Sequence, residues 1–306
     1  MEILYLLEKI RLPGINELML LVTKLGEETA FLVIAMTVFW CIDKRKGYYL
    51  LSVGFLGTMV NHTLKLLFRV PRPWVLDPDF PILEQAREAA GGYSFPSGHT
   101  QTAVGTFGTL AVTARKQGWK IGFILLAALV GFSRMYVGVH TPADVLAGAA
   151  VAIVLIIGLK NLTLAGDHRK MMGLMGLMIL SALAFVAFVN CWNFPADIDT
   201  HNLESGTKSA FTLLGSTVAL AAVYVVDTNW LRFPVKAVWW VQIIKVAVGF
   251  GLVLAVKEGL RAPLEMLMPV YPARAVRYFL IVSVAGILWP MSFRKLSGLG
   301  KGRSEG

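Results

Sequence analysis

Residues 142–160 read PADVLAGAAVAIVLIIGLK, a stretch whose only charged side chains, Asp144 and Lys160, lie near its two ends. Crossing the hydrocarbon core of a bilayer takes about 20 helical residues. Inside that core the backbone polar groups must be satisfied within the protein, which a single helix achieves. The stretch therefore predicts a transmembrane α-helix.

The composition of the whole chain points the same way. Hydrophobic residues make up 56% of the 306 residues and charged residues only 16%, with a mean hydropathy of +0.64. An ordinary soluble domain is about a quarter charged, and a chain this apolar cannot cover its surface with polar groups. We therefore expect an all-α integral membrane protein, a polytopic transmembrane helical bundle. Soluble globular and disordered classes are excluded.

Nine apolar segments approach spanning length, and the shorter ones need residues from their flanks. They fall at 27–42, 47–69, 98–114, 119–138, 142–160, 171–190, 208–227, 236–257 and 274–292. Residues 1–26 are predicted to form an interfacial segment of two amphipathic helices split by Pro13 and Gly14. Charged residues interrupt the first apolar run, so no cleavable signal peptide is expected.

The net charge is +10, from 29 Lys and Arg against 19 Asp and Glu. In a membrane protein such an excess is expected in cytoplasmic loops. One alternate set of loops, with the tail, holds fifteen Lys and Arg, and the other holds eleven. This places loops 70–97, 139–141 and 191–207 on the non-cytoplasmic face. Cys41 and Cys191 then face opposite sides, so neither a disulfide nor a metal site is expected.

Three polar motifs interrupt the apolar pattern. Their residues are Lys65, Arg72 and Pro73; Pro96, Ser97, Gly98 and His99; and Ser133, Arg134, His140 and Asp144. The first ends the second apolar segment, the second opens the third segment, and the last joins the fourth to the fifth. All these segment ends lie on the same predicted membrane face. We therefore expect the three motifs to meet in one site.

This pattern, Lys-x6-Arg-Pro, then Pro-Ser-Gly-His, then Ser-Arg-x5-His-x3-Asp, resembles the signature of the type-2 phosphatidic acid phosphatase superfamily. The superfamily includes lipid phosphate phosphatases, and vanadium haloperoxidases share its type of pocket. The resemblance covers about residues 27–190 and implies a lipid-phosphatase core bundle there, with the active site. Residues 191–292 would add further transmembrane helices, followed by a polar tail over 293–306.

The resemblance also implies roles for eight residues. His140 would be the nucleophile that forms a phosphohistidine, Asp144 would fix its tautomer, and His99 would be the general acid and base. The substrate phosphate would be bound by Lys65, Arg72, Ser97, Gly98 and Arg134. Their charges make physical sense for a phosphate, since three cations stabilise the transition state without a metal or other cofactor.

Each residue also has a simpler reading. Asp144 follows Thr141 at the spacing of a helix cap, Ser97 stands at a helix start, and Lys65 and Arg134 lie near helix ends where they can reach the interface. Three coherent motifs on one face favour the catalytic reading. Nucleic-acid binding is not expected, because no basic tract is interleaved with aromatic residues.

The expected substrate is a lipid phosphate monoester or diphosphate that enters from the bilayer. Candidates are phosphatidic acid, phosphatidylglycerophosphate, a polyprenyl diphosphate and, slightly favoured by the long C-terminal extension, a long-chain-base phosphate. Two alternatives remain. A lipid phosphotransferase would use the same site with an alcohol acceptor. A transporter would need two related halves, and the sequence has no such internal symmetry.

Overall fold

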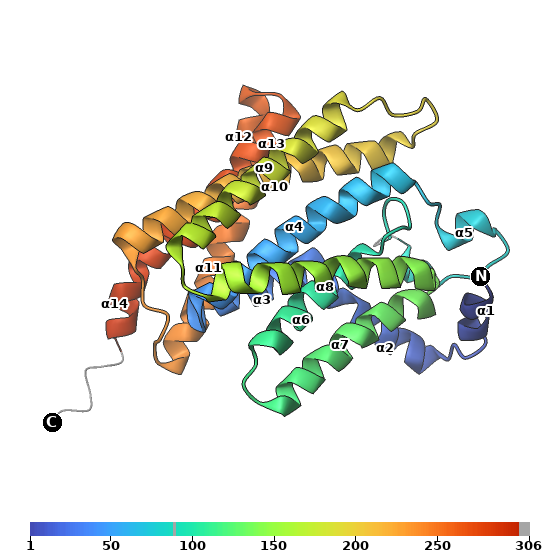
Figure 1. Cartoon of the computed structure of the whole chain (residues 1–306), viewed down its shortest axis with the longest axis horizontal. Helices are drawn as coiled ribbons and strands as arrows, with labels where there is room; N and C mark the ends of the chain where they lie inside the picture. The colour runs from blue at the N-terminus through green and yellow to red at the C-terminus, as the bar shows by residue number, and fades with distance from the viewer. Residues whose placement is uncertain (88–89, 300–306) are drawn as a thin grey trace. The chain divides into compact units, whose positions relative to one another are not determined.

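The computed structural model describes residues 1–87 and 90–299, and every regular element within them is a helix, in the order labelled in Figure 1. The all-α prediction is confirmed. The longer helices are α2 (Pro13–Lys24), α3 (Glu28–Cys41), α4 (Lys44–Phe68), α6 (Gly98–Thr113), α7 (Gln117–Tyr136), α8 (Pro142–Leu164), α9 (His168–Cys191), α10 (Thr200–Val226), α11 (Trp239–Gly259) and α13 (Val270–Ser283). The short elements are α1 (Glu2–Glu8), α5 (Pro73–Leu76), η1 (Glu84–Ala86), η2 (Asp227–Leu231), α12 (Arg261–Leu267), η3 (Val284–Leu288), η4 (Pro290–Ser292) and α14 (Phe293–Gly298).

The chain divides into two compact units. Unit 1 comprises residues 1–34, 49–161 and 193–206, and unit 2 comprises 35–48, 162–192 and the residues from 207 onward. All three sequence motifs belong to unit 1. Part of the predicted polar tail forms α14, while residues 300–306 lie outside the described residues.

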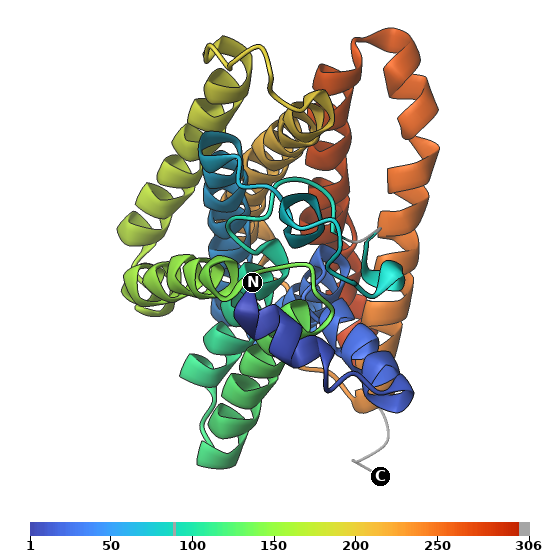
Figure 2. The ribbon, with the colours of Figure 1, turned by 90° about the vertical axis from the view of Figure 1, so that its right-hand side faces the viewer.

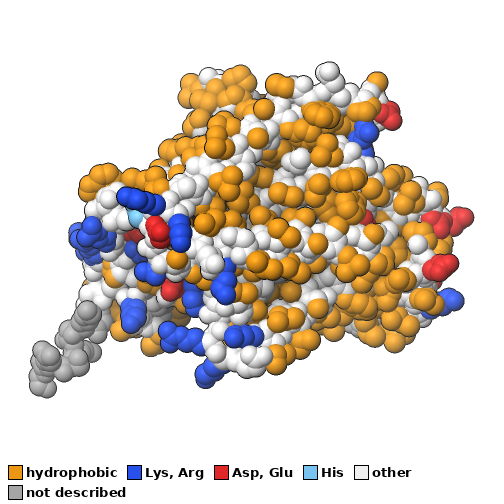
Figure 3. All heavy atoms as spheres, viewed as in Figure 1, with side chains coloured by type: hydrophobic (Ala, Val, Ile, Leu, Met, Phe, Trp, Pro, Cys, Tyr) orange, Lys and Arg blue, Asp and Glu red, His pale blue; other side chains and the backbone are white. Residues whose placement is uncertain are grey.

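Seven helical stretches of the described chain are long and apolar enough to cross a membrane. They are Lys44–Leu76, Gln117–Tyr136, Pro142–Leu164, His168–Cys191, Thr200–Leu231, Trp239–Leu267 and Val270–Gly298. The face in Figure 3 is covered mostly by hydrophobic side chains, as lipid contact requires. The chain is thus an integral membrane protein. Helices α3 and α6, with 14 and 16 residues, correspond to the two other predicted segments but are shorter than these seven.

Helix α8 shows how the sequence sets which side of a helix is buried. Ala152, Ile156 and Leu159 recur at helical spacing and are buried, whereas Leu146, Val154 and Ile157 are exposed on the outward side. Gly148 continues the buried stripe toward the start of the helix. A Cβ atom there would stand 2.5 Å from the carbonyl oxygen of Ser97. The missing side chain therefore lets α8 pack directly against the backbone that begins α6.

Helices α2, α6 and α7 share a hydrophobic cluster in unit 1. Its buried members are Val22, Ala103, Phe107, Ala127 and Val130. Figures 1 and 2 both show α6 and α7 running side by side. The cluster fixes the end of α7 that carries Arg134 next to the helix that begins with Gly98.

The predicted pair of N-terminal helices is present as α1 and α2, with Pro13 as the first residue of α2. Arg11, between them, donates to the carbonyl oxygens of Tyr136 (3.0 Å) and Pro81 (2.6 Å). Tyr5 donates to the Asp77 carboxylate at 2.8 Å. These contacts tie the N-terminal segment to the loop after α5 and to the end of α7.

Unit 2 has its own buried charges. Lys44 pairs with Asp227 at 2.7 Å. Lys245, fully buried in α11, donates to the carbonyl oxygens of Pro234 and Val235 at 3.2 and 3.0 Å and lies over the ring of Phe293. Lys245 therefore satisfies the irregular backbone between η2 and α11, which is a structural role.

The contact at Gly148 can be tested by adding a side chain. In Gly148→Val the new methyl groups collide with the Ser97 backbone, and overpacking of this kind costs about 1–3 kcal/mol. We expect a lower midpoint of thermal unfolding in detergent. Gly158→Val on the same helix is the matched control, since nothing lies within 4 Å of a Cβ there. Equal midpoints for the two variants would show that α8 does not need this close approach.

Candidate active site

The first motif is arranged around the end of α4. Arg69, with φ of 49°, takes the left-handed conformation that ends the helix. Lys65, in the last turn, donates to the carbonyl oxygen of Tyr93. Arg72 is buried, and its guanidinium donates to the carbonyl oxygens of Gly91 and Gly92 at 2.8 and 2.9 Å. Both cations are therefore held by backbone carbonyls of the loop that precedes the second motif.

The second motif begins α6. Ser97 is the N-cap, and its Oγ accepts hydrogen bonds from the backbone N–H (3.4 Å) and the hydroxyl (2.9 Å) of Thr100. The backbone N–H of Ser97 donates to the carbonyl oxygen of Asp144 at 2.9 Å. This bond joins the second motif to the third directly.

The third motif places His140 in the loop between α7 and α8. Asp144 Oδ2 accepts hydrogen bonds from the Thr141 N–H (2.7 Å) and the Ser94 hydroxyl (2.6 Å) and lies 3.5 Å from His140 Nδ1. The Asp144 N–H in turn donates to Thr141 Oγ1 at 3.4 Å. Asp144 therefore caps α8, as the simpler reading held, and also faces the His140 ring.

The two ring nitrogens of His140 have different partners. Arg72 Nη1 lies 2.8 Å from Nε2 and can only donate, so Nε2 carries the lone pair. The proton then resides on Nδ1, toward Asp144. Arg72 Nη1 also donates to the Val139 carbonyl oxygen at 2.9 Å, which fixes the guanidinium beside the ring.

The His140 ring is electrically neutral near pH 7. Burial, followed by the positive charges of Arg72, Arg134 and Lys65, holds the pKa of this imidazole well below its usual range. Because the pKa is lowered, the ring gains a proton only in more acidic solution than an ordinary histidine requires. A neutral ring with a lone pair on Nε2 is the form that can attack an electrophile.

Arg134 is fully buried at the end of α7. Its Nη1 donates to the Thr23 hydroxyl of α2 at 2.6 Å, while its Nε and Nη2 have no hydrogen-bond partner among the described residues. Unsatisfied buried donors are rare in proteins. An anion bound next to this guanidinium would satisfy both donors.

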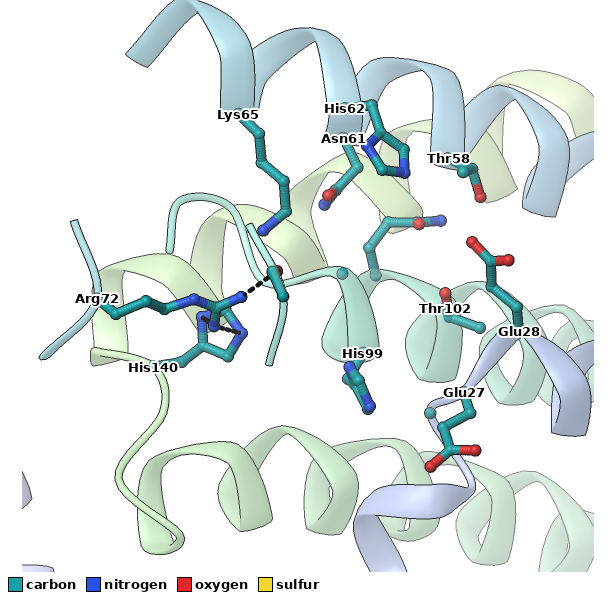
Figure 4. Close-up of a pocket in the computed structure, with 14 residues that line it drawn as sticks. Glu27, Glu28, Thr58, Asn61, His62, Lys65, Arg72, His99, Thr102 and His140 are labelled. Carbon is teal, nitrogen blue, oxygen red and sulfur yellow. Dashed lines mark hydrogen bonds between the residues drawn. The ribbon is translucent and has the colours of Figure 1, made fainter. Parts of the chain in front are cut away.

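A cavity of about 440 Å³ adjoins these residues. Lys65, Arg72, Gly98, His99 and His140 line it, and Figure 4 shows Lys65, Arg72 and His140 at one end. The other predicted site residues, Ser97, Arg134 and Asp144, are buried and do not line it. His99 Nε2 is buried and has no hydrogen-bond partner in the described part of the chain.

Among the described residues, no three His, Cys, Asp or Glu side chains gather in a way that would hold a metal ion. The donors around the cavity are instead cationic side chains, backbone N–H groups and imidazoles. Such donors suit an anion with several oxygens, and phosphate is the common one.

Comparison with known proteins identifies the family. A family model described as the PAP2 superfamily matches residues 45–166, and one described as its phosphatase transmembrane extension matches residues 211–302. The chain is 32% identical to phosphatidylglycerophosphatase B of Bacillus subtilis over 50% of its own length and 77% of that protein. The chain belongs to the PAP2 superfamily.

Other relatives are named as diphosphatases. An undecaprenyl-diphosphatase of Sulfolobus acidocaldarius is 30% identical over 48% of this chain and 70% of that protein. An undecaprenyl-diphosphatase of Bacillus subtilis is 32% identical over 41% of this chain. The chain covers only 63% of the length of that relative. No solved structure matches the chain. The family predicted from the motifs is confirmed.

Several residues around the PAP2 site were missed by sequence reasoning. Ser94 stands two residues before the Pro-Ser-Gly-His motif, so its position gave a weak signal for the contact with Asp144. Thr23 is far from every motif and gave none. Glu27, Glu28 and Gln101 line the cavity and carry no pattern of their own.

The Thr23 contact generates a prediction about the PAP2 anion site. In Thr23→Val the Arg134 guanidinium loses the one side chain among residues 1–87 and 90–299 to which it donates a hydrogen bond, and it is no longer held in place. Hydrogen bonds to charged groups contribute about 1.5–3 kcal/mol, so we expect inorganic phosphate to bind at least about tenfold more weakly. Thr23→Ser keeps the hydroxyl and is the matched control. The measurement is protection by phosphate against thermal unfolding, and equal protection of both variants would contradict this role for Thr23.

Proposed function

We propose that this chain is a membrane phosphatase that hydrolyses a lipid phosphate monoester or diphosphate through a phosphohistidine at His140. The observation that carries the proposal is the setting of His140: a neutral ring beside the cavity, with Nε2 next to Arg72 and Nδ1 facing Asp144. The names of the PAP2 relatives support the same reaction class.

In the proposed first step, Nε2 of His140 attacks phosphorus and the bond from phosphorus to the leaving oxygen breaks. Lys65, Arg72 and Arg134 neutralise the charge that spreads over the other phosphoryl oxygens. Ser97 accepts its hydrogen bonds from Thr100, which leaves its own hydroxyl proton to donate. The backbone N–H of Gly98, at the start of α6, adds a further donor to the anion.

His99 supplies and removes the proton. A bound phosphate brings negative charge next to this ring and favours its protonated form. His99 gives that proton to the leaving alkoxide in the first step and takes one from water in the second. Water then attacks the phosphohistidine, inorganic phosphate is released and His140 returns to its neutral form. Asp144 keeps the His140 proton on Nδ1 throughout.

The membrane location supports a lipid substrate, which reaches the cavity from the bilayer. We further propose that α3 and α6 cross the membrane, which gives nine spans, and that the site opens on the non-cytoplasmic face. Residues 27–190 would hold the catalytic core and 191–292 the additional helices. Phosphatidic acid, phosphatidylglycerophosphate, a polyprenyl diphosphate and a long-chain-base phosphate are the candidate substrates.

The direct test is phosphate release from a panel of these lipids in detergent, with EDTA present throughout. We expect turnover to persist in EDTA, since three cationic side chains do the work of a metal. A strict Mg²⁺ requirement would overturn the mechanism. If the phosphoryl group is transferred only to an added alcohol, as a new ester, the protein is a phosphotransferase instead.

The two histidines are separable by the choice of leaving group. His140→Ala removes the nucleophile, so we expect turnover to fall by at least about a thousandfold for every substrate. His99→Ala removes the general acid, which is worth about 10²–10⁴-fold for an alkyl ester and much less for an aryl phosphate. The measurement is acid-labile phosphoenzyme from an aryl phosphate, which His99→Ala retains in part and His140→Ala lacks.

Asp144→Asn serves as the intermediate case, because the amide keeps the shape but loses the charge and favours the wrong tautomer. We expect its turnover to lie between those of the two histidine variants on the aryl ester. Labelled phosphoenzyme in His140→Ala would place the nucleophile elsewhere.

Membrane orientation gives a further prediction. In a chain with Cys41 and Cys191 changed to Ser, a thiol at exposed Asp79, in the loop after α5, is expected to react with an impermeant maleimide added to intact cells. A thiol at exposed Arg115, between α6 and α7, is expected to react only after the cells are opened. The opposite pattern would put the cavity on the cytoplasmic face.

A further inference from the structure

Helix α13 carries two arginines that the proposed reaction does not use. Arg274 and Arg277 are three residues apart, so they are neighbours on the surface of the helix. The Cζ atom of Arg274 lies 5.4 Å from the centre of the Tyr278 ring, and that of Arg277 lies 5.6 Å from it. Two positive charges of unit 2 therefore gather around one aromatic ring.

Arg277 is unusual for a charged residue of a membrane helix. Only 6% of its surface is exposed, and it belongs to Val270–Gly298, a stretch long and apolar enough to cross a membrane. Its Nε has no hydrogen-bond partner among the described residues. An arginine near a helix end ordinarily extends its head group into the interface, whereas this one is buried in the protein. A buried charge of this kind in a membrane-spanning segment indicates a binding function.

In the described part of the chain, no carboxylate forms an ion pair with either arginine. The nearest acidic residues along the chain have other partners. Glu258 pairs with Lys257 at 3.7 Å, and Glu265 pairs with Arg261 at 3.6 Å. A buried cation without an opposite charge is costly. The two arginines therefore call for an anion that the chain itself does not supply.

Helix α10 holds Arg274 in place. Arg274 Nε donates to Thr212 Oγ1 at 2.7 Å. One turn further along, a Cβ atom on Gly215 would collide with the carbonyl oxygen of Ala275, so α10 and α13 pack with their backbones in contact. The bond to Thr212 takes one of the five N–H groups that a guanidinium has. The anchored side chain thus keeps donors for an anion.

The position of the pair along the helix favours a lipid as the source of this anion. Val270–Gly298 has 29 residues, whereas about 20 cross the hydrocarbon core of a bilayer. The ends of this stretch therefore extend into the headgroup layer. Arg274 is the fifth residue of α13 and Arg277 the eighth, which puts both close to the level of the lipid phosphates. Basic pockets between membrane helices bind anionic headgroups in this way.

We propose that Arg274 and Arg277 bind the phosphodiester of an anionic bilayer lipid. Thr212 orients the first guanidinium, and the Tyr278 ring stabilises both charges. The site belongs to the transmembrane extension of the family, residues 211–302, and none of its residues lines the cavity of unit 1. A zwitterionic lipid suits it less well, because the ammonium of that headgroup is repelled by two guanidiniums.

The test adds either of two lipids to the full chain in detergent and follows the midpoint of thermal unfolding. Phosphatidylmethanol has a phosphodiester and no cation, while phosphatidylcholine has the same acyl chains and phosphodiester with an added ammonium. A ligand that binds only the folded protein raises the midpoint. We expect phosphatidylmethanol to reach half of its full effect at about a tenfold lower mole fraction, the factor of one charge-assisted hydrogen bond.

Variants assign the preference to the two arginines. In Arg274→Gln with Arg277→Gln we expect the two lipids to act at equal mole fractions. The matched control is Lys257→Gln with Arg261→Gln, which removes two exposed charges that precede α13 and keeps the tenfold difference. If the double arginine variant does not fold, Arg274→Gln alone changes a half-buried residue, and its difference is expected to fall below about threefold.

Three results would overturn the proposal. The first is equal mole fractions for the two lipids in the unaltered protein. The second is a tenfold difference that persists without the two arginines, which would put the lipid elsewhere. The third is an equal loss in the control pair, which would show that only the overall charge matters.

Inorganic phosphate separates a lipid headgroup from a free anion. We expect it to change the midpoint equally in the unaltered protein and in the double arginine variant, because a free phosphate has its site in unit 1. A smaller change in the variant would show that Arg274 and Arg277 bind free phosphate, and would overturn the assignment to a lipid. Neither lipid is a phosphate monoester, so this outcome is decided whether or not the chain proves to be a phosphatase.

Discussion

Arg72 and Arg134 are buried in unit 1 and Lys65 is half-buried there, and their hydrogen bonds to the described residues go to uncharged groups. Lys65 is held by one backbone carbonyl, Arg72 by three carbonyls and the His140 ring, and Arg134 by one threonine hydroxyl. Carbonyls and hydroxyls offset part of the cost of burying a cation but leave its charge uncompensated. Burial, together with this remaining positive charge, lowers the pKa of His140 and keeps its ring neutral, and the positive charge attracts an anion into the cavity.

The loop before α6 makes this arrangement possible. The carbonyl oxygens of Gly91, Gly92 and Tyr93 all point to the cations of the first motif, and Ser94 then turns to Asp144. Consecutive residues of one loop thereby bind both the first and the third motif. The alignment of the whole site depends on the path of this loop and less on any one side chain.

The sequence predicted the helical membrane fold and which motifs meet, because apolar length and the shared membrane face of helix ends are local properties. His140, Arg72 and Asp144 were found in this way. Thr23 was not, since its contact with Arg134 depends on how α2 packs against α7. The carbonyls of residues 91–93 were also out of reach, because backbone groups carry no sequence signal. The hydropathy pattern predicted that α3 and α6 reach spanning length, but both helices are shorter than that.

One carboxylate oxygen of Asp144 serves both the helix cap and the site. Oδ2 accepts a hydrogen bond from the Thr141 N–H at the start of α8, and it also faces His140. Fraying of one helical turn therefore disorients the His140 ring, the nucleophile that we propose, while the rest of the bundle stays intact. Loss of turnover on heating or in mild denaturant would then report the opening of this turn, well before the helices separate. The stability that matters to the enzyme is local, and it belongs to the first four residues of one helix.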